Sequence, residues 1–84
     1  MYLIDVYAER QEYEKIIPLY EILITRHPNN PQYYASLAVT YAFIEDKENA
    51  FININKAVEL QPELAEEAKK FLIEQGIDIN KYKN

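Results

Sequence analysis

The side chains that most often perform chemistry are scarce in this chain of 84 residues. His27 is the single histidine, Ser36 is the single serine, and cysteine is absent. Nucleophilic catalysis needs a hydroxyl or thiol within hydrogen-bond reach of a base, and Ser36 with His27 is the candidate pair. We expect Ser36 on a helix and His27 in a loop between helices. The sequence therefore predicts no catalytic residue, and we expect that the chain is not an enzyme.

Metal and cofactor sites are not expected either. One histidine without cysteine cannot build a transition-metal site. Gly76 is the single glycine, so there is no glycine-rich loop for a phosphate group. Carboxylates that act as acid and base need an enclosing pocket, so we expect Glu66 and Glu67 on a solvated helix face. We therefore expect the protein to bind neither a cofactor nor a metal ion.

Composition and charge narrow the classes of partner. The chain is 49% hydrophobic and 27% charged, which is typical of one small folded domain. Its formal charge is −5 and it has no dense run of Lys or Arg, which argues against nucleic acid as a partner. No apolar run approaches the length of a membrane span, so direct membrane insertion is not expected. A chain without cysteine is compatible with any compartment.

The sequence repeats itself with a period of 34 residues. The residues that match after this shift are Leu3 with Leu37, Tyr7 with Tyr41, Ala8 with Ala42, Glu14 with Glu48, and Pro28 with Pro62. Apolar residues between these positions also fall on apolar residues. A period of this length predicts tandem copies of one helix–turn–helix unit.

One complete copy of the unit lies within residues 31–62. Its aromatic, small and large apolar residues recur at fixed spacings: Tyr34, Leu37, Ala38, Tyr41, Ala50, Ile54, Ala57 and Pro62. This pattern resembles the tetratricopeptide repeat (TPR), which differs in having an aromatic residue at the position of Ile54. The resemblance implies an all-α fold, arranged as a right-handed α-solenoid of antiparallel helix pairs. It also implies a scaffold for protein–protein interactions.

The resemblance divides the chain into four parts. Residues 1–28 form a first TPR unit that is truncated at its N-terminus, and residues 31–62 form a second, complete unit. Residues 63–76 are expected to form a C-terminal capping helix, followed by a tail at 77–84. In the first unit Ile4 and Ile16 replace small residues of the family, which predicts wider packing. Pro18 predicts a bend or a solvated gap in a helix over residues 12–26.

In the TPR family the first helices of successive units line a concave groove that receives partner peptides. Carried over to this chain, the resemblance implies a partner-binding face made of Asp5, Glu9, Gln32, Ala35, Ser36, Val39, Phe43, Glu66 and Lys70. Ala35, Val39 and Phe43 follow at four-residue steps, so they share one face of a helix. This apolar row either binds a partner or packs against neighbouring helices.

Three functions are open at this stage. The first is an interaction module cut from a longer chain within its first unit, which binds a protein or peptide. The second is self-assembly, in which the two ends of the solenoid meet head to tail. Its candidate contacts are Tyr2, Ile4, Ile77 and Ile79. The third is an accessory region of an enzyme, such as a membrane glycan polymerase, whose chemistry resides elsewhere.

Overall fold

The fold is known from a computed structural model, which describes the backbone of residues 2–82. The side chains of Tyr2, Ile79 and Tyr82 lie outside its described part. The elements are α1 (Tyr2–Glu9), α2 (Tyr13–Arg26), α3 (Pro31–Phe43), α4 (Lys47–Leu60), the 3₁₀ turn η1 (Pro62–Leu64), α5 (Ala65–Glu74) and α6 (Ile79–Tyr82). No strand occurs among these residues, so the predicted all-α class is confirmed.

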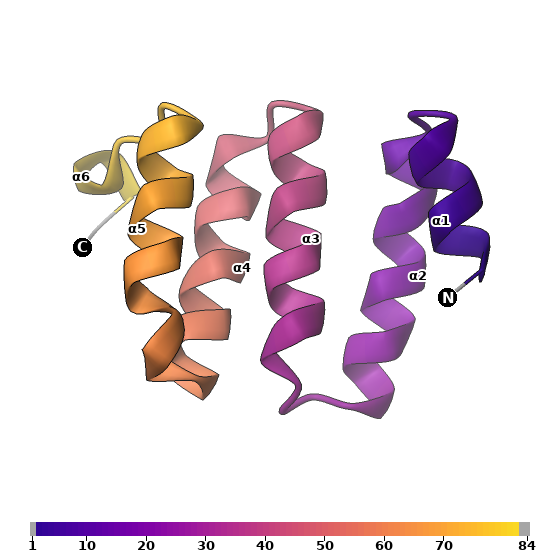
Figure 1. Cartoon of the computed structure of the whole chain (residues 1–84), viewed down its shortest axis with the longest axis horizontal. Helices are drawn as coiled ribbons and strands as arrows, with labels where there is room; N and C mark the ends of the chain where they lie inside the picture. Colours follow the sequence, from indigo (N-terminus) through magenta and orange to yellow (C-terminus); the bar gives the residue numbers. More distant parts are fainter. Residues whose placement is uncertain (1, 83–84) are drawn as a thin grey trace.

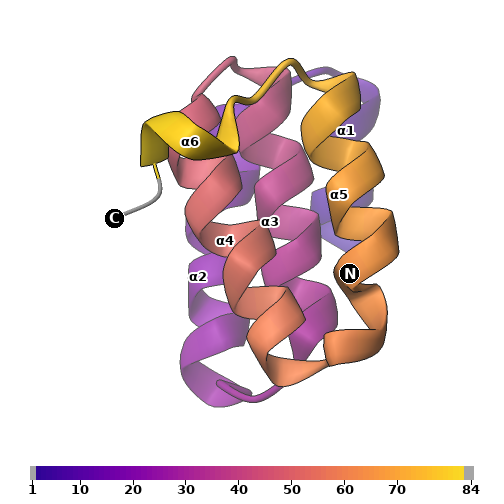
Figure 2. The same ribbon diagram turned by 90° about the vertical axis from the view of Figure 1, so that its left-hand side faces the viewer.

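Successive helices are also neighbours in space. Contacts join α1 to α2, α2 to α3, α3 to α4, and α4 to α5. The chain therefore advances along its longest axis, with the N-terminus at one end and the C-terminus at the other (Figure 1). In the turned view α4 and α5 lie in front of α3, and the short α6 crosses the end of α4 (Figure 2).

The helix boundaries follow the same period as the sequence. α2 spans residues 13–26 and α4 spans residues 47–60, so α4 begins and ends 34 residues after α2. α3 begins at Pro31 and α5 begins at Ala65, again 34 residues later. α1 ends at Glu9 and α3 ends at Phe43. The repeated residues thus produce repeated local structure.

Local capping groups set several of these boundaries. The Asn30 side chain accepts a hydrogen bond from the Gln32 amide at 3.0 Å, and Pro31 opens α3. The Asp46 side chain accepts a bond from the Asn49 amide at 3.2 Å and so caps α4. A capping bond of this kind contributes about 1 kcal/mol.

The turns after α1, α3 and α5 share one motif. A residue with positive φ stands two positions after the last residue of each helix: Gln11 at 59°, Glu45 at 61° and Gly76 at 67°. The next amide then donates to the carbonyl five residues earlier, which gives the pairs Glu12 to Tyr7, Asp46 to Tyr41, and Ile77 to Leu72. These bonds satisfy carbonyls at the helix ends and reverse the chain. Glycine is the favoured residue at this position, so Gln11 and Glu45 carry a backbone cost that Gly76 does not.

Pro18 lies inside α2, which nevertheless continues from Tyr13 to Arg26. Because proline has no amide hydrogen, the carbonyl of Glu14 lacks its usual helical donor. Glu14 and Pro18 are both exposed, so water has access to this part of the helix. The bend expected at Pro18 stays a prediction.

The main core lies between α3, α4 and α5. Ala38 of α3 and Ala50 of α4 belong to this core and have 0% exposure, and Ala57 of α4 is equally buried. Leu37 and Ile54 are buried as well, so all five of these motif positions are interior positions. The cluster continues into α5 and its C-terminal turn through Phe51, Ala68, Leu72 and Ile77.

The buried residues of the α1–α2 hairpin lie apart from this main cluster. These residues are Ile4 and Ile16, and neither belongs to the main cluster. α2 contacts α3, and this contact joins the hairpin to the rest of the molecule.

Replacing Glu45 with glycine is expected to raise the free energy of unfolding by about 0.5–1 kcal/mol, because glycine adopts positive φ without steric cost. Urea denaturation followed by circular dichroism measures the change. Glu48→Gly is the matched control, since Glu48 is helical and its replacement should lower stability by about 1 kcal/mol. A loss of stability in both variants would show that position 45 is not strained.

Candidate functional site

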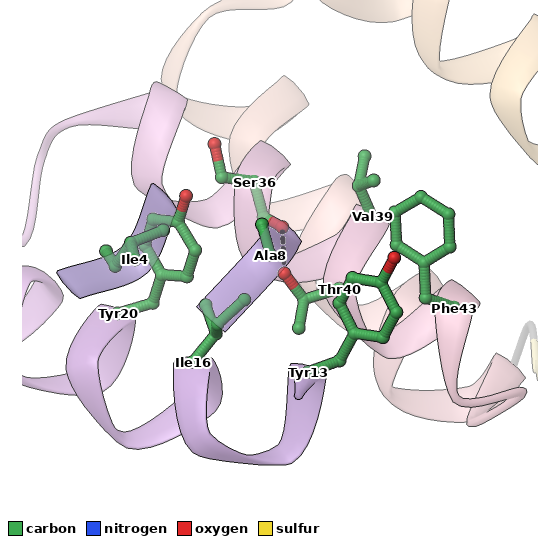
Figure 3. Close-up of a pocket in the computed structure, with 9 residues that line it drawn as sticks. All are labelled: Ile4, Ala8, Tyr13, Ile16, Tyr20, Ser36, Val39, Thr40 and Phe43. Atoms are coloured by element: carbon green, nitrogen blue, oxygen red, sulfur yellow. Dashed lines mark hydrogen bonds between the residues drawn. The ribbon is translucent and has the colours of Figure 1, made fainter. Parts of the chain in front are cut away.

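A hollow opens between the α1–α2 hairpin and α3 (Figure 3). We call it the first hollow. Its volume is about 220 Å³, and it is lined by Ile4, Ala8, Tyr13, Ile16, Tyr20, Ser36, Val39, Thr40 and Phe43. Most of this lining is aliphatic or aromatic, so the hollow is suited to an apolar side chain.

A second hollow lies on the other side of α3, toward α5. Its volume is about 160 Å³, and it is lined by Ala35, Val39, Ile54, Leu64, Glu67, Ala68 and Phe71. Val39 lines both hollows and is 40% exposed. This valine is therefore a ridge between two apolar depressions.

Hydroxyl groups provide the polar part of the first hollow. The Thr40 hydroxyl donates to the Ser36 carbonyl within α3 at 2.9 Å (Figure 3). Among the described residues, the hydroxyls of Tyr13, Tyr20 and Ser36 have no hydrogen-bond partner. Each of these hydroxyls can donate and accept, so they are available to a ligand.

An aromatic pair forms part of the lining. The rings of Tyr13 and Phe43 are stacked, with centroids 4.6 Å apart and planes inclined by 11°. This contact joins α2 to α3, yet Phe43 stays 60% exposed. The pair thus both braces the hairpin and offers a flat apolar surface.

Part of the face predicted from the sequence borders the hollows. Ser36, Val39 and Phe43 line the first hollow, and Ala35 and Val39 line the second. The remaining five are exposed and line neither hollow: Asp5, Glu9, Gln32, Glu66 and Lys70.

Sequence reasoning missed the contribution of α2. Tyr13, Ile16 and Tyr20 follow at three- and four-residue steps, which could have identified one face of a helix. The spacing alone does not distinguish residues that pack from residues that line a hollow.

A further hollow lies at the C-terminal end of the helix array, and we call it the end hollow. Its volume is about 430 Å³, and it is lined by Asn55, Val58, Ala65, Ala68, Lys69, Leu72, Ile73, Ile77 and Asp78. Ile73 is 71% exposed there.

The predicted self-association residues are placed differently. Ile4 and Ile77 are buried by their own chain, so their side chains offer little surface to another copy. The side chains of Tyr2 and Ile79 lie outside the described part. The role of these four residues in self-association stays a prediction.

A charged group braces the turn between α1 and α2. The Lys15 ammonium donates to the Glu12 carboxylate, and it lies 5.7 Å from the centre of the Tyr7 ring. The hydrogen bond from Lys15 lowers the pKa of Glu12, and the Glu12 carboxylate raises the pKa of Lys15. The contact helps to hold the hairpin that forms one wall of the first hollow.

We expect Glu12 to titrate below the usual range of a glutamate. Since its folded-state pKa is lowered, the stabilisation from this pair is present above the usual carboxyl pKa and is lost as pH falls through the folded-state pKa. Carboxyl-carbon NMR measures the midpoint. Lys15→Met should return the pKa of Glu12 toward the usual value, whereas Lys56→Met should leave it unchanged. Equal midpoints in the parent chain and Lys15→Met would contradict the assignment.

Other kinds of site are not evident in the part of the chain that the structure describes. No group of three or more His, Asp or Glu side chains is placed to hold a metal ion within residues 2–82. No helix in that range is long and apolar enough to cross a bilayer. Comparisons with protein-family models, with curated proteins and with solved structures found no match.

Proposed function

We propose that this chain is a non-catalytic scaffold for protein–protein interactions, built as a TPR-type right-handed α-solenoid. The shared period of sequence and helix boundaries supports the repeat. The burial of the motif residues Leu37, Ala38, Ala50, Ile54 and Ala57 supports it as well. The partner is a peptide or a protein segment that lies across α3.

The observation that carries the binding role is the environment of Val39. An apolar side chain with 40% exposure stands between two apolar hollows. Hollows of about 220 and 160 Å³ are smaller than the roughly 300–1,000 Å³ typical of small-molecule sites. They suit single anchoring side chains of a longer partner. The same scaffold would serve equally as an accessory region of a membrane glycan polymerase, with the chemistry carried elsewhere.

Val39→Asp is expected to weaken peptide binding at least tenfold, because it places a charge on the apolar ridge. Peptides would be selected from a displayed random library against the parent chain, and their affinities measured by calorimetry. Ile52→Asp is the matched control: Ile52 is an apolar residue of α4, 53% exposed, and borders neither hollow. Circular dichroism confirms that each variant is folded. Equal affinity of the parent chain and Val39→Asp would contradict the site, as would a library that yields no binder.

A second candidate function is self-assembly, favoured by the end hollow and by the exposure of Ile73. An apolar surface at one end of an array can receive the opposite end of a second copy. Light scattering across a hundredfold range of concentration should then show a mass that climbs above the 10.0 kDa of one chain. Ile73→Lys should remove the increase. A constant monomer mass in the parent chain would exclude this function.

A further inference from the structure

Acidic side chains lie on both outer helices that contribute to the hollows beside Val39, α1 and α5. On α1, Asp5 follows the lining residue Ile4, and Glu9 follows the lining residue Ala8. On α5, Glu67 lines the second hollow and Glu66 precedes it. These four carboxylates are exposed.

Among the described residues, none of the four carboxylates forms an ion pair. Ion pairs join Arg10 and Lys15 to Glu12, and Lys56 to Glu59. None of them includes Asp5, Glu9, Glu66 or Glu67. The cations on this stretch of α5 are Lys69, which lines the end hollow, and Lys70, which follows the acidic pair by one helical turn. The face around the hollows therefore carries an excess of negative charge, in keeping with the net charge of −5.

The arrangement combines the apolar hollows with four carboxylates, Asp5, Glu9, Glu66 and Glu67, which we call the acidic surround. Each part selects for a different feature of a ligand. The hollows accept apolar side chains, whereas the surround attracts cations and repels anions. The exposed ring of Phe43, stacked on Tyr13, adds a π-face on which an arginine side chain can rest.

From this juxtaposition we infer that the partner is a basic peptide segment with two apolar anchors. One anchor fills the first hollow and the other fills the second, so that the segment crosses Val39. Lysine or arginine residues on either side of the anchors face the carboxylates of α1 and α5. This inference rests on the proposed function, and it adds the charge and the pattern of the partner.

Three displayed peptide libraries test the inference. Each has the same randomised central segment, and the flanking residues are fixed as lysine, serine or glutamate. We expect enrichment mainly from the lysine library, with selected central segments that contain two apolar residues. Similar enrichment from all three libraries, or enrichment from the glutamate library, would overturn the basic partner and leave the proposed function in place. Enrichment from none of them would overturn both.

Charge-neutralising variants provide a second test with the selected lysine-flanked peptides. Glu9→Gln with Glu67→Gln should weaken binding about tenfold at low salt, and the difference from the parent chain should shrink in 0.5 M NaCl, because salt screens exposed charges. The control pair is Glu14→Gln with Glu48→Gln, which are exposed carboxylates at repeat-equivalent positions of α2 and α4. It should change binding less than twofold. Equal losses in the two double variants would overturn the assignment of the acidic surround.

Discussion

The close contact between α3 and α4 is the constraint on which most of this structure depends. Ala38 and Ala50 have no exposed surface, and their short side chains allow the two helices to approach. With α4 held this near to α3, Phe51 and Ile54 belong to the same cluster as residues of α5. A larger side chain at any of the alanines would push α4 outward and disturb that cluster. The position of the second hollow, which Ile54 helps to line, is therefore set by alanines that do not touch solvent.

α3 is packed differently on its two sides. Toward α4 it presents small residues, and toward the hairpin it faces the larger side chains of Ile4 and Ile16 across a hollow. The Tyr13–Phe43 stack fills part of the space between α3 and the hairpin, and the rest of that space is open to a ligand. The hollow thus follows from a change of side-chain size between one helix contact and the next. The exposed position of Val39 follows as well, because no helix covers the interval between the two hollows.

The sequence predicted the features that depend on local chemistry. The unit that starts at Pro31 and its alanines could be identified because each is marked by residue type and spacing. The turns were less predictable, since Gln11 and Glu45 occupy positive φ where glycine would have been the signal. The hollows could not be predicted, because they depend on how far α2 stands from α3. Tyr13 illustrates the limit: its residue type fits a core, a surface or a site equally well.

The separation of the α1–α2 hairpin from the main cluster has a consequence for how a ligand would act. The buried residues of the hairpin lie outside the main cluster, so the hairpin can open locally at a lower free-energy cost than global unfolding. The first hollow exists only while the hairpin is docked, since Ile4, Tyr13 and Ile16 form one of its walls. Occupancy of the first hollow by a ligand and docking of the hairpin on α3 are thus thermodynamically linked. A ligand bound in the first hollow would stabilise the docked position of the hairpin on α3 and slow amide exchange along α1 and α2.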